Sequence, residues 1–416
     1  MDILIKNIKS LVNIADRPDK WVAGAAMSQL KTLDDAYLRV SDGKIADYGR
    51  MDELTGEDAP AEQVDASGRM VFPSFCDSHT HLVYAGSREI EYGDKIRGLS
   101  YQEIARRGGG ILNSAKRLHQ TPEDDLYHQS LARVNEIIAL GTGAVEIKSG
   151  YGLTVEDEIK MLRVIRRLKE TTPITIKSTF LGAHSIPAEY KEDPDKYVDL
   201  VVNEMIPEVG RQNLADYVDV FCDRGFFTVQ QTDRILNAAA KYGLRAKLHA
   251  NELDYSGGIQ AGVSHQALSV DHLEYTGEEE IQALLASQTM PTILPGAAFF
   301  LGLVDPPVRK MMQAGLPLAL ASDYNPGSSP SGNMKLIMSL GTIKLKMLPE
   351  EVIHAATSNG AYAMGEEKHL GTITQGKTAN IFVTKPIPSY QFMPYAYGSY
   401  LIDQIMLNGQ WQDYPL

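Results

Sequence analysis

The chain has 416 residues, of which 44% are hydrophobic and 22% charged, the composition of an ordinary globular protein with one large domain and a smaller one. The formal net charge of −13 argues against nucleic acid or an anionic membrane as a partner. No apolar run approaches the roughly 18 residues that a membrane helix needs. Charges at Asp2, Lys6 and Lys9 interrupt the start where a secretory signal would be apolar.

The cysteine content points to a reducing compartment. Cys76 and Cys222 cannot build a disulfide framework and do not form a CxxC pair. A soluble, unprocessed, cytoplasmic protein is therefore the expectation.

The first 70 residues predict short strands joined by turns. DILIKNIKSLVNI is followed by YLRVSDGKIADYG, in which Asp42 and Gly43 form a hairpin signal. A similar pattern returns in GTITQGKTANIFVTK (371–385) and LIDQIMLNGQ (401–410). We therefore expect residues 1–70 and 371–416 to form one small β-sandwich domain from both chain ends.

Between the two ends, apolar strand-like runs alternate with helical segments, which is typical of a parallel α/β fold. The helical segments include VEDEIKMLRVIRRLKE and TDRILNAAAKYG, and the latter ends at Gly243. Eight runs are expected as strands: 70–81, 142–150, 174–184, 217–223, 244–251, 267–274, 290–296 and 317–327. This count predicts a TIM-like (β/α)8 barrel over residues 71–370, with catalytic groups at the carboxyl ends of the strands.

Polar residues able to perform chemistry follow nearly all of these runs. A structural protein has no reason to place so many at one rim of its barrel, although any one of them could be a buried histidine or a capping aspartate. The residues are His79, His81, Lys148, His184, Asp223, His249, His272 and Asp323.

Four of these side chains match the ligand preferences of a divalent metal. His79 and His81 lie two apart on one strand and point the same way, which by itself would also fit the polar side of an ordinary strand. His249 and Asp323 from later strands complete a set of three nitrogens and one oxygen, with a position left for water. The fourth strand ends in Cys222 and Asp223, without the lysine that bridges a two-metal site, so one metal is expected.

Two further residues fit proton transfer beside such a metal. Coordination lowers the pKa of water, whose proton must then be accepted and delivered. Glu252 lies three residues beyond His249, and its alternative is a solvated loop carboxylate. His272 could orient the nucleophile without binding metal, and its alternative is a core histidine.

With these residues in place, the sequence resembles the amidohydrolase superfamily over essentially its whole length. The shared part is PSFCDSHTHL, HANE, SVDHLE and SDYNPG. A narrower likeness, to the branch that opens the cyclic amide of 4-imidazolone-5-propanoate, lies in SREIEYGDKIRG, RRGGGI, EIKSGYGL, LGAHSIPAEY and SDYNPGSSP.

The narrower resemblance implies hydrolysis of that small anionic substrate to N-formimidoyl-L-glutamate, with one Zn²⁺ or iron ion per subunit. It implies the same four metal ligands as the spacing, His79, His81, His249 and Asp323. Glu252 would protonate the leaving nitrogen, while Asp323 and His272 hold and deprotonate the water. It also implies a homodimer and these substrate contacts: Arg88, Tyr151, His184, Glu252, Asn325, Gly327 and Ser328.

Three features fit this pattern less directly. The run Gly108 to Gly110 lacks a P-loop lysine and is either a flexible linker or part of a loop that closes over substrate. Asp223 and Asn380 stand where many relatives have glutamate and aspartate. The first leaves doubt about local hydrogen bonding at the fourth strand.

Two other functions compete with this one. A nucleobase deaminase uses the same HxH, HxxE and final-strand aspartate, but it has no need for an arginine aimed at a carboxylate. A non-catalytic barrel that acts as a scaffold is the second alternative, although such proteins lose metal ligands that are all present here.

Overall fold

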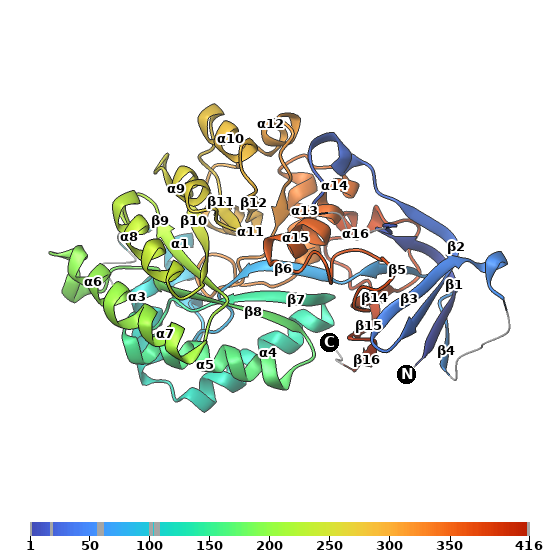
Figure 1. Ribbon diagram of the computed structural model, residues 1–416, viewed down its shortest axis with the longest axis horizontal. Coiled ribbons are helices and arrows are strands. Elements are labelled where there is room, and N and C mark those ends of the chain that lie inside the picture. Colours follow the sequence, from blue (N-terminus) through green and yellow to red (C-terminus); the bar gives the residue numbers. More distant parts are fainter. Residues whose placement is uncertain (1, 17–19, 56–61, 100–102, 104–108, 414–416) are drawn as a thin grey trace.

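The computed structural model describes residues 2–16, 20–55, 62–99, 103 and 109–413. It contains two eight-stranded sheets, one parallel and one mixed, which occupy the two ends of the molecule (Figure 1). Among the described residues, no helix is both long and apolar enough to cross a bilayer.

The parallel sheet forms the predicted barrel. Its strands neighbour one another in sequence order from β6 to β13, and each lies within one of the eight predicted runs. The strands are β6 (Phe75–Thr80), β7 (Thr142–Lys148), β8 (Thr175–Ala183), β9 (Tyr217–Cys222), β10 (Arg245–Ala250), β11 (Ser269–His272), β12 (Met290–Ile293) and β13 (Ala319–Leu320).

The barrel closes between its first strand and the segment that follows its last. Thr80 forms a parallel bridge with Tyr324. The amide of His81 donates to the Tyr324 carbonyl at 2.9 Å, and the amide of Asp323 donates to the His79 carbonyl at 3.0 Å. These bonds place the end of the eighth unit directly beside the histidine pair of the first.

Helices surround the barrel (Figure 1). Two were predicted from the sequence, α5 (Val155–Thr171) and α8 (Val229–Ala240), and α8 ends shortly before Gly243, whose φ is 75°. Thr154 and Thr228 cap them, because each hydroxyl accepts a backbone hydrogen bond at 3.2 Å three residues on.

The remaining helices connect strands or extend the loops at the rim. Before β9 they are α1 (Glu89–Ile96), α3 (Ile111–Gln120), α4 (Glu123–Ala139), α6 (Pro194–Leu200), a π-helical turn (Val201–Met205) and α7 (Ile206–Gln212). After β10 they are α9 (Gly258–Ser264), α10 (Glu278–Leu285), α11 (Pro295–Leu301), α12 (Val308–Gln313), α13 (Met334–Ile343), α14 (Pro349–Ala356), α15 (Ser358–Ala363) and α16 (Phe392–Tyr395). Short 3₁₀ turns occur at Gly24–Ser28, Met51–Glu53 and Ala188–Tyr190.

The mixed sheet combines both ends of the chain, as expected, in the order β16-β15-β14-β5-β1-β2-β3, with β4 paired to β1. Asp42 and Gly43 form the predicted hairpin turn with φ of 50° and 77°. The strands are β1 (Ile3–Val12), β2 (Thr32–Ser41), β3 (Lys44–Arg50), β4 (Glu62–Asp65), β5 (Met70–Pro73), β14 (Ile381–Thr384), β15 (Ile402–Leu407) and β16 (Gln410–Gln412).

The predicted strand over residues 70–81 is in fact two strands in different sheets. Ser74 separates β5 from β6: its amide donates to the Asn380 carbonyl at 2.9 Å, whereas the next amide, of Phe75, donates to Gly141 at 2.9 Å. The Asn380 side chain donates to the Gly143 carbonyl and accepts from the Asn408 amide. It therefore links the two sheets at their junction, while the proposed domain limits stay a prediction.

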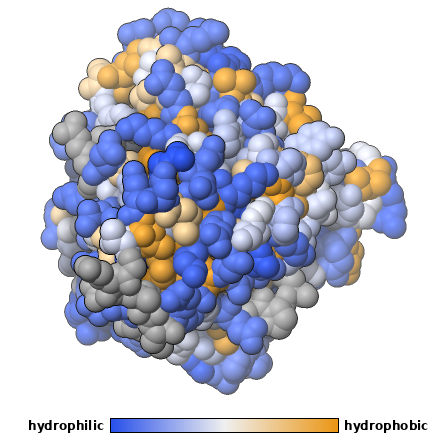
Figure 2. Space-filling model, turned by 90° about the vertical axis from the view of Figure 1, so that its right-hand side faces the viewer, coloured by the Kyte–Doolittle hydropathy of each residue, from blue (hydrophilic) through white to orange (hydrophobic). Residues whose placement is uncertain are grey.

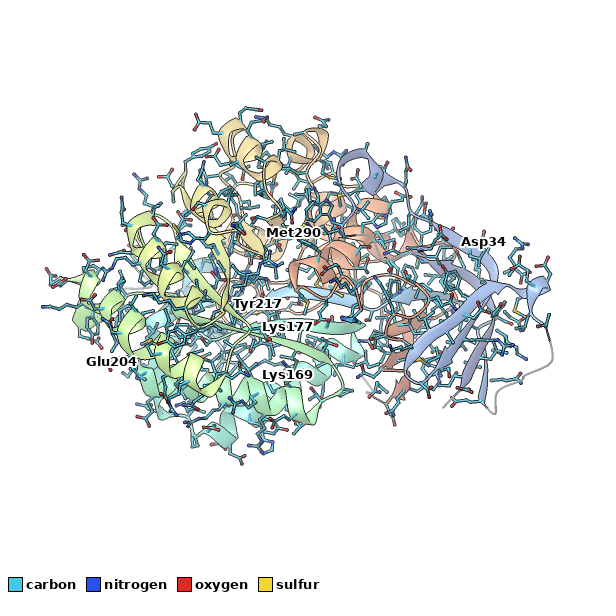
Figure 3. The ribbon with its side chains drawn as sticks, viewed as in Figure 1. Asp34, Lys169, Lys177, Glu204, Tyr217 and Met290 are labelled. Carbon is cyan, nitrogen blue, oxygen red and sulfur yellow. The ribbon has the colours of Figure 1, made fainter. Side chains whose placement is uncertain are left out.

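The amino-terminal rim of the barrel carries structural contacts. Lys177 and Tyr217 lie close together at the start of neighbouring strands (Figure 3). Lys177 pairs with Glu366 at 2.7 Å, and the Tyr217 hydroxyl donates to the Met364 carbonyl at 2.6 Å. Such contacts fix the turn after α15 and leave the carboxyl-terminal rim for the site.

The outer face of the small domain is shown in Figure 2. Hydrophilic residues predominate there, and the hydrophobic ones form small separate areas. Scattered apolar areas of this kind are ordinary on protein surfaces. The homodimer stays a prediction.

Candidate active site

The predicted site residues meet at one cavity. It has a volume of about 440 Å³, within the range of small-molecule sites, and it opens at the carboxyl ends of the barrel strands. All of the metal ligands, proton-transfer residues and substrate contacts proposed from the sequence line it except the buried His79. They are His81, Arg88, Tyr151, His184, His249, Glu252, His272, Asp323, Asn325, Gly327 and Ser328.

Three histidines form a cluster at the base of this cavity, and two of them, His81 and His249, line it. One ring nitrogen from each of His79, His81 and His249 lies within 4.8 Å of the others, and all three side chains are buried. Nε2 of His81 is 3.2 Å from Nε2 of His249. Asp323 joins them, with Oδ1 at 3.6 Å from His79 Nε2 and 3.5 Å from His81 Nε2.

Buried carboxylates orient two of these rings. Asp271 lies 2.6 Å from Nδ1 of His79, and Asp219 lies 3.0 Å from Nδ1 of His249. An aspartate accepts hydrogen from Nδ1, so Nε2 of each ring keeps its lone pair and faces the cluster. Burial alone would raise the pKa of Asp219, but His249 and Lys148 outweigh it and hold that pKa well below its usual range.

The cluster suits a metal ion. Burial lowers the pKa of His79 and His81 well below the usual value, so both rings are neutral and able to coordinate. Nε2 of His79 and Nδ1 of His81 are buried without a hydrogen-bond partner among the described residues. A cation between the facing nitrogens would satisfy the otherwise unpaired Nε2 of His79.

Asp323 is presented by a tightly organised loop. Asn325 accepts from the amides of Gly327 and Ser328 at 2.7 and 2.8 Å and donates to the Asp323 carbonyl at 2.7 Å. The Ser328 hydroxyl donates to Asp323 Oδ2 at 3.3 Å. Asn325 is thus committed to shaping this loop, while burial raises the pKa of Asp323 to about 6.

Asp223 holds Glu252 in position. One oxygen of Asp223 accepts from the amides of Glu252 and Leu253 at 2.7 and 2.8 Å, and the other accepts from Arg224 and Ser256. The aspartate at this position therefore leaves no gap in the local hydrogen bonding. Burial, aided by the charges of Asp323 and Asp223, raises the pKa of Glu252 to about 8.

His272 lies beside Glu252 in a strained conformation. Its φ is 86° and that of Leu273 is 72°, values that residues with side chains rarely adopt and that are enriched at functional sites. Its Nδ1 is 3.7 Å from Glu252, and neither ring nitrogen has a hydrogen-bond partner among the described residues. The ring is therefore free to contact a ligand.

Arg88 precedes α1 and reaches into the cavity. Its Nε and Nη2 both lie 2.8 Å from Glu91 Oε2, and Glu91 also accepts from the Gly110 amide and the Asn113 side chain. Nη1 faces Gly327, where an added Cβ would lie only 2.0 Å away. Glu91 thus holds Nε and Nη2, whereas Nη1 has no hydrogen-bond partner among the described residues and could donate to a ligand.

Aromatic rings form the remaining wall. His184 stacks on His81 with ring centroids 4.9 Å apart, and Tyr151 lies 5.3 Å from His184. Nδ1 of His184 contacts the Gly150 carbonyl at 2.9 Å, and burial lowers the pKa of His184 to about 3. Phe221 and Phe226 stack beside them, which gives a flat ligand an apolar surface to lie on.

The sequence reasoning missed Asp219, Asp271 and Glu91. Both aspartates stand within apolar strand runs, YVDVFC and ALSVDHLE, and a charged residue inside such a run is the signal that could have found them. Gly108 lies outside the described residues, so the proposed closing loop stays a prediction. Both cysteines are free and buried.

The fold and the histidine cluster define a class of protein. Residues 70–411 match the family model described as the amidohydrolase family, and the chain belongs to that family. Solved structures agree on the fold: E. coli guanine deaminase superposes with a TM-score of 0.74 at 13% identity, covering 100% of both chains. An adenosine deaminase from Xanthomonas campestris with bound zinc gives 0.72 at 16%, covering 99% of this chain and 92% of that one.

Closer relatives narrow the assignment to the imidazolonepropionases. The imidazolonepropionase of Christiangramia forsetii is 52% identical over 99% of this chain and 100% of its own length. That of Flavobacterium johnsoniae is 53% identical over the same shares, and that of Brevibacillus brevis 39% over 98% and 97%. This chain is therefore an enzyme, a hydrolase of this group, and the scaffold alternative is set aside.

Proposed function

We propose that this protein opens the ring of 4-imidazolone-5-propanoate to give N-formimidoyl-L-glutamate, a step of histidine degradation, with one Zn²⁺ bound and iron as the alternative. The observation that carries the proposal is the union, in one cavity, of a metal-type histidine cluster and an arginine with a free edge. Ring hydrolysis needs the first, and recognition of a propionate side chain needs the second.

His79, His81, His249 and Asp323 would hold the metal. When bound, it supplies Lewis-acid chemistry, which polarises the ring carbonyl and makes water acidic enough to attack at neutral pH. Asp323 and His272 line the same cavity and would accept the proton of the attacking water. The chain thus provides both the ligands and the base.

Glu252 is suited to deliver the second proton. The new bond joins the water oxygen to the ring carbonyl carbon, and the bond from that carbon to the ring nitrogen breaks. The departing nitrogen must gain a proton as it leaves. A buried carboxyl with a pKa raised to about 8 is protonated at neutral pH and can donate it.

Arg88 would bind the propionate. Glu91 fixes its Nε side, so the Nη1 side meets the substrate carboxylate as a charge-assisted donor pair. Tyr151 and His184 would contact the imidazolone ring, and the Ser328 hydroxyl and Gly327 backbone would complete the enclosure. A neutral nucleobase carries no carboxylate that this arginine could bind, so the arginine favours the anionic substrate over a nucleobase.

Purified protein tests the proposal directly. We expect loss of the ultraviolet absorbance of 4-imidazolone-5-propanoate, dependent on added zinc or iron after chelator treatment. Detection of N-formimidoyl-L-glutamate by mass spectrometry would confirm the reaction. Absence of this activity in metal-loaded enzyme, together with ammonia release from a nucleobase, would favour the deaminase.

Gly327→Ala is expected to weaken substrate binding without unfolding the protein. The new methyl group would displace the Arg88 guanidinium, which is the flexible end of a side chain. A shift of about 1 Å at a binding group costs on the order of 10- to 100-fold in kcat/KM. We expect the loss mainly in KM, with the thermal midpoint unchanged; a wild-type KM would show that Arg88 does not bind substrate from this position.

A further inference from the structure

A fully buried lysine lies beneath the histidine cluster. Lys148, at the end of β7, has no solvent exposure, and its ammonium lies 2.7 Å from Glu146 and 2.8 Å from Asp219. The carboxylate of Asp271 is 3.8 Å away. One cation thus contacts both aspartates that orient histidines.

These two aspartates have few other ways to remain buried and charged. Asp219 accepts from the His249 ring and amide, and Asp271 contacts the His79 ring while its Oδ1 has no partner among the described residues. A buried carboxylate without a cation is strongly unfavourable. Lys148 is the cation in direct ion-pair contact with Asp219.

A second buried lysine has a different role. Lys247 donates to the Ser78 carbonyl at 2.8 Å and the Ala363 carbonyl at 3.1 Å, and it forms an ion pair with Glu146 at 3.0 Å. It makes no ion pair with Asp271, although its charge opposes the rise that burial causes in the pKa of that carboxyl more than the charge of Lys148 does. Glu146 joins the two lysines and also accepts from the Thr179 hydroxyl.

We propose that Lys148 is a positioning residue for the metal. By binding Asp219 and Asp271 together it holds the rings of His249 and His79 with Nε2 aimed at one point. The lysine has no solvent exposure and is not among the residues that line the cavity, so it would act through the aspartates. This inference rests on the metal site proposed above.

The primary test is the zinc affinity of metal-free protein, measured by competition with a chromophoric chelator. Lys148→Met removes the charge and keeps the length of the side chain. We expect its zinc dissociation constant to rise about 10- to 100-fold, as loss of groups that orient metal ligands does. Wild-type affinity in folded Lys148→Met would overturn the proposal.

Lys377→Met is the matched control. Lys377 is also a buried lysine, but its ammonium donates to the Leu370 carbonyl and the Thr372 hydroxyl near the small domain. We expect it to lower the thermal midpoint while zinc affinity stays at the wild-type value. An equal loss of zinc affinity in both variants would mean that Lys148 acts only through general stability.

A double-mutant cycle shows whether Lys148 acts through Asp219. In the Asp219→Asn background, Lys148→Met should raise the zinc dissociation constant much less than it does in the wild type. We expect the change in the logarithm of this constant to be less than half as large. Additive losses would overturn the proposed route.

Folding of the single variant is not required for a result. If Lys148→Met does not fold, the double variant is compared with Asp219→Asn alone, since neither buries an unpaired Asp219 charge. A further loss of zinc affinity as large as tenfold in the double variant would overturn the proposal. Failure of the wild type to bind zinc would instead overturn the metal site itself.

Discussion

Glu252→Gln is expected to keep its metal and lose its turnover. Glutamine preserves the shape of the side chain, and the backbone amide of residue 252 still donates to Asp223, so the loop should not move. Glutamine cannot deliver a proton to the departing ring nitrogen. Loss of a general acid costs on the order of 10² to 10⁴ in kcat. The measurement is kcat on 4-imidazolone-5-propanoate beside the zinc content of the same sample.

His249→Ala provides the contrasting variant. Its ring belongs to the buried histidine cluster, so we expect zinc and activity to be lost together. Metal loss in both variants would show that Glu252 acts as a ligand, and normal turnover in Glu252→Gln would remove it from the proton transfer.

Much of the fold was predictable because the barrel strands neighbour one another in sequence order. Eight apolar runs separated by helices leave few arrangements once crossovers are right-handed and parallel. The error at residues 70–81 has a physical cause. Met70 to Thr80 are all buried, on both sides of Ser74, so hydrophobicity does not mark the residue at which the chain leaves one sheet for the other.

The meeting of the proposed metal ligands was predictable for a related reason. His79 and His81 share one side of a strand, and strand ends meet at one rim, so spacing alone brings His249 and Asp323 to them. Spacing does not tell which strand faces which across the barrel. The pairings of Asp219 with His249 and of Asp271 with His79 depend on that packing, and they appear only in the structure.

The proposed substrate contacts had a different origin. Arg88 lies in a loop after the first barrel strand, and no periodicity fixes where such a loop folds. Its assignment came from the family resemblance. The structure adds a physical reason, since Glu91 binds one edge of the guanidinium and Gly327 leaves room for the other.

Arg88→Met is expected to lower kcat/KM for 4-imidazolone-5-propanoate about 100-fold or more. Removal of one partner from a buried charged pair costs about 2–5 kcal/mol. Methionine retains much of the bulk of the side chain, so the cavity should keep its shape. The measurement is steady-state kinetics, with zinc content expected to remain at the wild-type value because Arg88 lies outside the histidine cluster.

Two controls separate charge recognition from a general defect. Arg97→Met removes an exposed arginine at the other end of α1, paired with Asp94, and should leave kcat/KM unchanged. The propionamide analogue of the substrate lacks the carboxylate. The wild-type enzyme should therefore turn over this analogue about as poorly as Arg88→Met turns over 4-imidazolone-5-propanoate. If instead Arg88→Met retained wild-type kcat/KM on the natural anion, the substrate assignment would fail. An enzyme that acts on a neutral ring, such as a nucleobase deaminase, needs no cation at this position.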